Sequence, residues 1–165
     1  MPTMSRRAAG SGQLVVQYRA RTRAGLPHRR SLERWTHAAI SGAYAVTIRF
    51  VDAIDGRSLN RRFRGKDYAT NVLTFTYDEG NGPRSRSRTG PSMHAGDIVL
   101  CVPVIASEAR VQKKAPRAHY AHLVVHGLLH LQGFDHERTR DALRMEAHER
   151  KILAGLGYSD PYAPV

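Results

Sequence analysis

Cysteine is almost missing from this chain. Cys101 is the only one among 165 residues, so no internal disulfide can form. Chains without disulfides are typical of reducing compartments, which favours the cytoplasm. Cys101 lies within the apolar run 98–102. We therefore expect a small buried hydrophobic side chain at this position rather than a reactive thiol.

Long apolar segments are missing as well. No stretch approaches the roughly 20 apolar residues that a membrane-spanning helix needs. Near the N-terminus, Arg6 and Arg7 are not followed by the apolar core of a secretory signal peptide. Residues 1–12 are rich in Ser, Arg, Ala and Gly and are predicted to form a flexible tail. These absences also favour a cytoplasmic protein.

Acidic residues are scarce too. The 14 Asp and Glu stand against 26 Lys and Arg, which gives a formal net charge of +12, and 22 of the basic residues are arginines. The planar guanidinium group of arginine matches the geometry of phosphate oxygens. Such a charge favours an anionic polymer as partner, through counterion release and electrostatic steering. Solubility or genome composition explains it equally well, so charge alone leaves nucleic-acid binding open.

The chain after the predicted tail, residues 13–165, is predicted to form one domain, because this length is ordinary for a single domain. Short apolar and alternating segments among helical ones indicate an α/β (α+β) fold, with one mixed four-stranded sheet packed by about five helices. The predicted strands cover 14–18, 46–51, 72–75 and 97–102. The predicted helices cover 31–41, with Ser31 as N-cap, and then 58–63, 104–113, 117–132 and 139–156.

Residues 80–91 separate the third and fourth predicted strands and contain three alternate arginines, Arg84, Arg86 and Arg88. Their Pro, Ser and Gly content predicts a basic mobile loop. RNA contact and a solvated insertion are both open interpretations of these arginines.

Three histidines form the clearest chemical pattern, His126-Gly-Leu-Leu-His130-Leu-Gln-Gly133-Phe-Asp-His136. Residues four apart lie on the same face of a helix, so His126 and His130 can bind one ion. In a continuous helix His136 would lie about 15 Å beyond His126, too far to share that ion. Gly133 can adopt the left-handed conformation that ends a helix and turns the chain back. The spacing thus predicts a three-histidine metal site with a reversal at Gly133.

Three neutral imidazoles around Zn²⁺ leave the fourth tetrahedral position open for water, which is typical of a catalytic site. The pKa of such a water falls to about 7. A structural zinc site usually has four protein ligands that include cysteine, and no cysteine is near. Asp135 and Glu137 are candidates for orienting the imidazoles, while His122 is expected beside the site rather than as a ligand. Other divalent metals also accept three imidazoles.

The same histidine spacing occurs in metzincin proteases, where a glutamate beside the first histidine is the general base. In this chain that position is Gly127, which cannot accept a proton. A metal ion with three neutral ligands keeps its positive charge, which suits a phosphodiester in a basic protein. The pattern favours a nuclease, and a metal-dependent peptidase-like hydrolase remains an alternative.

From about Val46 to the C-terminus the chain resembles the YbeY family, the bacterial endoribonucleases of rRNA maturation. The segments that carry the resemblance are Val46–Asp52, Leu59-Asn60, Arg64–Asp67, Thr70–Phe75, Gly96–Val99, the histidine motif with Ala121–Gly127, and Leu156–Tyr162. The resemblance implies a zinc site of His126, His130 and His136, which would be catalytic together with Arg64. It further implies a single-strand-specific endoribonuclease acting in 16S rRNA 3′-end maturation and ribosome quality control.

The partners that the resemblance implies are rRNA, the small ribosomal subunit, and a ribosomal protein or ribosome-associated GTPase. Arg64 is also supported by its surroundings, since residues 61–66 hold four positive charges that can clamp a phosphate. A solvated helix end or a salt bridge to Asp67 explains Arg64 equally well. A non-catalytic assembly factor stabilised by zinc remains a second alternative, and the attacking group, water or the ribose 2′-OH, stays open.

Overall fold

The computed structural model describes residues 12–77 and 93–164. The predicted loop 80–91 and all of the predicted tail except Gly12 lie outside these residues. The strands are β1 (Gly12–Tyr18), β2 (Tyr44–Val51), β3 (Val72–Thr76) and β4 (His94–Cys101). The helices are α1 (Arg29–Ala39), α2 (Ala53–Arg64), α3 (Val102–Val111), α4 (Pro116–Leu131) and α5 (Thr139–Gly155). Within the described ranges, no helix is both long and apolar enough to cross a membrane.

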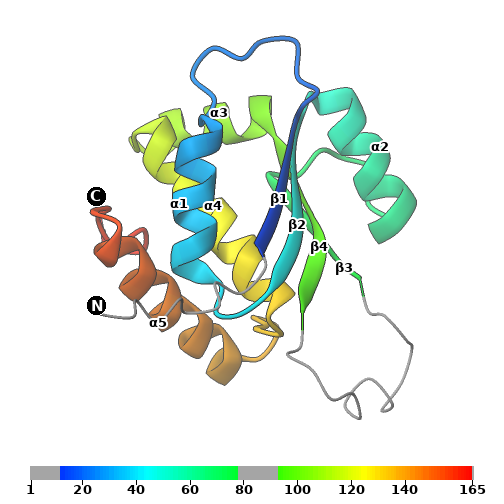
Figure 1. The fold of residues 1–165 in the computed structure, drawn as a ribbon. Coiled ribbons are helices and arrows are strands. Elements are labelled where there is room, and N and C mark those ends of the chain that lie inside the picture. The colour runs from blue at the N-terminus through cyan, green and yellow to red at the C-terminus, as the bar shows by residue number, and fades with distance from the viewer. Residues whose placement is uncertain (1–11, 78–92, 165) are drawn as a thin grey trace, which may run out of the picture.

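The sheet is mixed, as predicted, with the strand order β1-β2-β4-β3. Strands β1, β2 and β4 are parallel, and β3 pairs with β4 in the antiparallel direction. Helices α1 and α4 cover one face of the sheet and α2 covers the other, while α5 packs on the outside of α4 (Figure 1). The described part of the chain therefore confirms the predicted α/β fold with a four-stranded sheet and five helices.

Strand β4 contributes to the apolar core on both faces of the sheet, because side chains alternate along a strand. Ile98 and Leu100 are fully buried in the larger cluster, together with the apolar side of α4. Val99 and Cys101 belong to the smaller cluster beneath α2 and α3. Cys101 is only 1% exposed, which confirms that it serves as a small hydrophobic side chain.

Helix α4 approaches β4 closely at Gly127. A Cβ atom at this position would lie 3.0 Å from the side chain of Ile98, so a larger residue there would require Ile98 to shift. The close contact fixes the position of α4 on the sheet at the residue that follows His126. A side chain at position 127 would point into the sheet.

Several predicted boundaries were wrong. Helix α1 begins at Arg29 with His28 at the N-cap, so Ser31 lies inside the helix and does not cap it. Helix α2 begins at Ala53, five residues before its predicted start, because Gly56 is buried against Cys101 and hides the apolar periodicity. Gly12 belongs to β1, where it pairs with Tyr44. Strand β4 starts at 94 and α3 at 102, earlier than predicted.

Candidate metal centre

The structure brings the three predicted histidines together. His126 and His130 lie one turn apart on α4, and His136 lies in the segment that follows this helix. One nitrogen of each imidazole falls within 4.8 Å of the nitrogens of the other two. The Nε2 atoms of His126 and His130 are 3.1 Å apart. Two ligands of a tetrahedral zinc ion stand about 3.3 Å apart, so this spacing suits a shared ion.

The chain reverses after α4 as the sequence predicts. Gly133 has a φ of 93°, in the left-handed region that glycine adopts without strain. The N–H of Gly133 donates to the carbonyl of His130, and that of Phe134 donates to the carbonyl of Leu129. These two bonds are those of a Schellman motif, which closes the helix and lets the chain return toward His126.

The hydrogen bonds of His126 and His130 show which nitrogens are free. His130 Nδ1 lies 2.9 Å from the carbonyl of Phe134, which can only accept, so Nδ1 must carry the proton. His126 Nδ1 lies 2.5 Å from a carboxylate oxygen of Glu149 and donates in the same way. Burial and the two neighbouring histidines lower the pKa of His130, which keeps its imidazole neutral.

Because both Nδ1 atoms are paired with acceptors, the Nε2 atoms are the ones that can serve as metal ligands. At 3.1 Å the two Nε2 atoms are close enough to bind one shared cation. The donor set therefore fits a metal ion that accepts imidazole nitrogen, and zinc is the divalent ion most often bound in this way.

Glu149 on α5 is the residue that sequence reasoning missed. Its side chain is completely buried and accepts hydrogen bonds from His126, His122 and Tyr162. Burial alone raises the pKa of its carboxyl, but these hydrogen bonds outweigh burial and lower the pKa to about 2. A carboxylate that orients a ligating imidazole is a common support of metal sites.

The sequence holds one signal for Glu149, because it lies on the buried stripe of α5 between Met145 and Leu153. The predicted orienting role of Asp135 was wrong. Its carboxylate accepts the backbone N–H groups of His136, at 2.7 Å, and of Glu137, at 3.3 Å. Asp135 thus shapes the turn before His136 and contacts none of the imidazole nitrogens.

His122 lies one turn before His126 and outside the three-histidine cluster, in line with the expectation from sequence. Its Nε2 is 3.1 Å from Glu149 and 3.2 Å from the hydroxyl of Tyr162. Tyr162 itself donates to Glu149. Burial and the adjacent carboxylate raise the pKa of Tyr162, so this phenol stays protonated and can donate.

Arg64 is the last residue of α2 and is exposed. Its Nη2 donates to the carbonyl of Thr74 at 2.8 Å, and the guanidinium lies 5.6 Å from the ring centre of Phe75. The salt bridge to Asp67 that the sequence left open is instead made by Arg57, at 2.9 Å. Arg64 therefore stands at the edge of β3, exposed and held by its hydrogen bond to Thr74.

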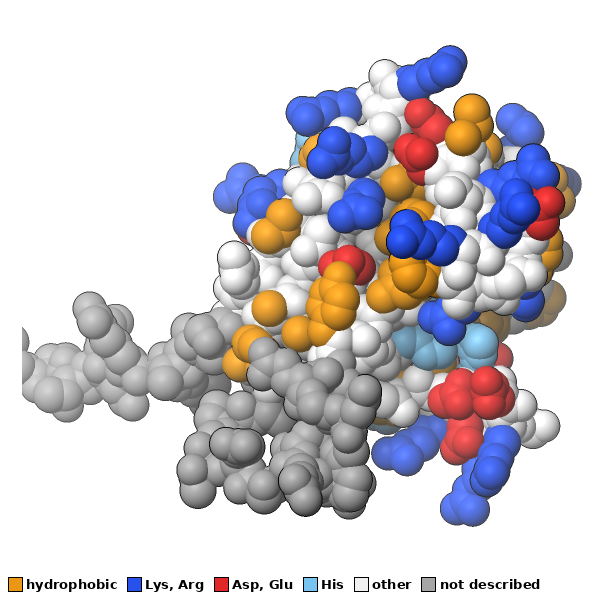
Figure 2. Space-filling view, turned by 90° about the vertical axis from the view of Figure 1, so that its right-hand side faces the viewer, with side chains coloured by type: hydrophobic (Ala, Val, Ile, Leu, Met, Phe, Trp, Pro, Cys, Tyr) orange, Lys and Arg blue, Asp and Glu red, His pale blue; other side chains and the backbone are white. Residues whose placement is uncertain are grey.

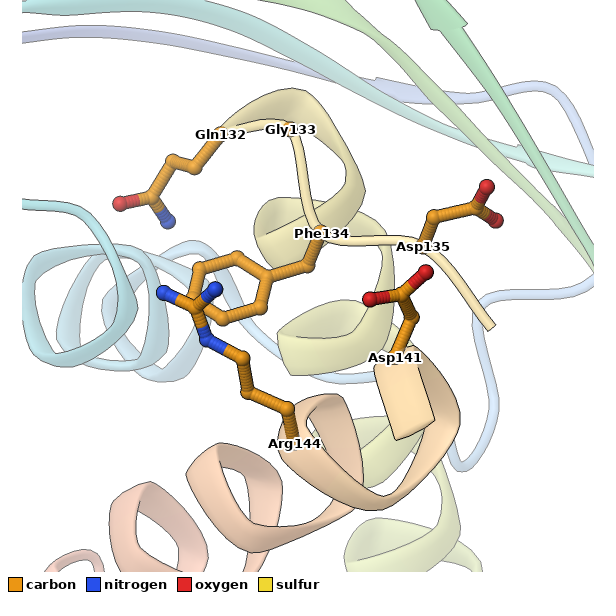
Figure 3. Close-up of a pocket in the computed structure, with 6 residues that line it drawn as sticks. All are labelled: Gln132, Gly133, Phe134, Asp135, Asp141 and Arg144. Atoms are coloured by element: carbon orange, nitrogen blue, oxygen red, sulfur yellow. The ribbon is translucent and has the colours of Figure 1, made fainter. Parts of the chain in front are cut away.

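Histidine side chains reach the surface at one place on the face that Figure 2 shows, between basic side chains above and acidic ones below. The reversal after α4 and the start of α5 also form a pocket of about 220 Å³ (Figure 3). The guanidinium of Arg144 lies 5.5 Å from the ring centre of Phe134 at this pocket. The pocket is lined by Gln132, Gly133, Phe134, Asp135, Asp141 and Arg144.

A family model described as Endoribonuclease YbeY matches residues 26–157. The chain belongs to the YbeY family. Among similar curated proteins, an "Endoribonuclease YbeY" from Cupriavidus metallidurans is 52% identical over 87% of this chain and 68% of its own length. Another from Nitrosospira multiformis is 51% identical over 92% of this chain and 82% of its own length. A third, from Aromatoleum aromaticum, is 52% identical over 87% of this chain and 86% of its own length.

The fold is also similar to the solution structure of TM1509 from Thermotoga maritima. The TM-score is 0.52 at 24% sequence identity, over 92% of this chain and 100% of that one. The YbeY match includes the three histidines, Arg64 and Glu149. Tyr162 lies beyond the matched residues, although its hydroxyl belongs to the same hydrogen-bond network.

Proposed function

We propose that this protein is a zinc-dependent, single-strand-specific endoribonuclease. The observation that supports the metal is the convergence of His126, His130 and His136, whose nitrogens lie within 4.8 Å of one another. RNA as substrate is supported by the names of the curated relatives, which are endoribonucleases, and by the net charge of +12.

His126, His130 and His136 would hold the zinc ion, which would supply a Lewis acid for an anionic phosphodiester. The residues of the chain do the rest. Glu149 holds the proton on His126 Nδ1 and so keeps its Nε2 available as a ligand. Arg64, anchored by its hydrogen bond to the carbonyl of Thr74, would offer its remaining N–H groups to phosphate oxygens of the substrate.

Glu149 does not serve as the general base in this proposal. It is fully buried, its carboxylate already accepts three hydrogen bonds, and its pKa of about 2 makes it a weak base. Its contribution is to orient His126 rather than to take a proton from the attacking group.

The proposal extends to the biological substrate. We place the activity in 16S rRNA 3′-end maturation and ribosome quality control in the cytoplasm, at the small ribosomal subunit with a ribosomal protein or GTPase as partner. Membership of the YbeY family supports this extension.

A peptidase is disfavoured by the packing of Gly127. The position that carries the glutamate of metzincins is a glycine packed against Ile98, so the chain has no general base there. A non-catalytic assembly factor is the second candidate. It is favoured by the Glu149 network, through which a metal at His126 would stabilise α5.

One assay separates these functions. Precursor 16S rRNA is incubated with wild type, Arg64→Ala and His126→Ala, each with and without a chelator. Arg110→Ala and His37→Ala are matched controls, because both change an exposed residue of the same type on another helix. We expect cleavage to be lost in both test variants and with chelator, and kept in both controls. Cleavage that persists in chelated His126→Ala protein contradicts the proposal, and stable folding without any cleavage in wild type favours the assembly factor.

A further inference from the structure

The C-terminal segment 157–162 folds back against α5 and the turn that follows α3, and is held there by several polar contacts. Lys114 Nζ donates to the carbonyl of Pro161 at 2.8 Å. The Arg150 guanidinium pairs with Asp160 at 3.1 Å, and the backbone N–H of Tyr162 donates to the same carboxylate at 2.9 Å. Arg150 also lies 5.1 Å from the centre of the Tyr162 ring. These contacts fix the position of the Tyr162 side chain, including its hydroxyl.

The Tyr162 hydroxyl contacts the buried carboxylate of Glu149, which supports the metal ligand His126. Glu149 presents Oε1 to His126 Nδ1, whereas its Oε2 receives the Tyr162 hydroxyl and His122 Nε2. A phenol donating to a carboxylate makes a charge-assisted hydrogen bond, which is roughly twice as strong as a neutral one. The segment is thereby joined to a metal ligand through two consecutive hydrogen bonds.

Packing of the Tyr162 ring does not account for the hydroxyl contact. The residue is 38% exposed, so its hydroxyl could reach water instead of a buried acid. Without the Tyr162 hydroxyl, His122 would be the remaining hydrogen-bond donor to Oε2 of Glu149. The carboxylate of Glu149 could then rotate toward His122. Among the described residues, the buried Nδ1 of His122 has no hydrogen-bond partner, so this imidazole is held by its Nε2 contacts to Glu149 and Tyr162, and loses one of them with the hydroxyl. The orientation of His126 would then loosen as well.

We propose that Tyr162 is a positioning residue of the metal centre, by which the C-terminal segment holds Glu149 and, through it, His126 in the geometry that binds the ion. The inference rests on the proposed function only for the presence of the metal. Because coupling between two sites is reciprocal, metal binding at His126 also favours the docked position of the segment.

The test compares Tyr162→Phe with Tyr158→Phe, which removes a hydroxyl from the same C-terminal region. The Tyr158 hydroxyl accepts from Arg117 at 3.1 Å and contacts no part of the metal centre, so it is a matched control. Zinc affinity is measured on the full chain by competition with a chromophoric chelator. We expect Tyr162→Phe to bind zinc about tenfold more weakly, at the lower end of the effect of removing such supports. Tyr158→Phe should stay within about twofold of wild type, well below that effect.

Two further readouts distinguish positioning from general stability. A merely structural role would lower Tm equally with and without zinc, whereas a tenfold loss of affinity shrinks the zinc-induced rise in Tm by about 3–6 °C. Amide hydrogen exchange in residues 157–162 should slow when zinc is added to wild type, and this slowing should diminish in Tyr162→Phe.

Each result has a definite meaning. Equal zinc affinity of the two tyrosine variants overturns the inference and leaves the proposed function standing. Failure of wild type to bind zinc overturns both. A selective loss of zinc affinity in Tyr162→Phe, in a protein that does not cleave RNA, supports the inference and removes the proposed nuclease activity.

Discussion

Replacing Glu149 by glutamine tests the support of the metal centre most directly, because the two side chains have the same shape. The carboxylate accepts hydrogen bonds from His126, His122 and Tyr162. Glutamine offers one acceptor oxygen and one NH₂ group. If its oxygen faces His126, the NH₂ group meets the Tyr162 hydroxyl and His122. If the NH₂ group faces His126, the imidazole must move its proton to Nε2, where it blocks metal binding.

Either orientation sacrifices at least one hydrogen bond to a charged group, each worth about 1.5–3 kcal/mol. We therefore expect Glu149→Gln to weaken zinc binding about 10–100-fold, as is typical when the partner of a ligating histidine is changed. This corresponds to about 1.4–2.8 kcal/mol of binding free energy. Chelator competition measures the affinity, and circular dichroism of the metal-free protein checks that the fold persists.

Glu33→Gln is the control for loss of a glutamate charge, because Glu33 forms an exposed ion pair with Arg29 on α1, away from the contacts of the metal centre. Its zinc affinity should equal that of wild type. Wild-type affinity in Glu149→Gln would refute the reasoning, since it would show that the buried carboxylate does not orient His126.

Three other predictions follow from particular residues. Gly133→Ala should lower the free energy of unfolding, measured in urea, by about 1–2 kcal/mol, because alanine is strained at the φ of 93° that position 133 adopts. A Cβ atom there would meet no other atom within 4 Å, so the cost comes from the backbone conformation and not from a steric clash. Wild-type stability in Gly133→Ala would contradict the left-handed turn. Burial lowers the pKa of His119 despite its hydrogen bond to Glu108, so the unfolded chain binds more protons than the folded one below the ordinary pKa of 6.5. The Tm of the chelated protein should therefore fall as the pH drops from 7 to below 6.5, and this fall should be smaller in His119→Gln. Identical dependence of Tm on pH in wild type and His119→Gln would contradict the lowered pKa of His119. Arg64→Lys keeps the charge but not the fork of N–H groups, so kcat should fall about 10²-fold with zinc affinity unchanged, and an active lysine variant would count against a phosphate clamp.

The histidine site could be predicted from sequence because its determinants are local. The four-residue spacing of His126 and His130 and the turn at Gly133 lie within eleven residues, and helix geometry decides where each points. The strand and helix pattern was equally local, apart from boundaries. The start of α2 was missed because Gly56 replaces an apolar side chain with close backbone packing against Cys101.

Glu149 and Tyr162 could not be assigned from sequence, since their roles depend on how distant segments pack. Glu149 lies 23 residues from His126, and Tyr162 lies 13 residues further along the chain. A glutamate on the apolar side of a helix signals a buried partner but does not identify it. The Thr74 contact of Arg64 depends likewise on the docking of α2 on the sheet.

The contact between Arg64 and Thr74 also has a consequence for solubility. Among the described residues, β3 is hydrogen-bonded on one side only, to β4, and Thr74 belongs to the residues whose backbone groups point away from that partner. An exposed strand edge can recruit a strand from another molecule, and a positive charge placed along it discourages such pairing. Arg64 thus shields the edge of the sheet against self-association. Light scattering of Arg64→Ala protein belongs beside its activity assay, because aggregation at β3 would otherwise pass for a loss of chemistry.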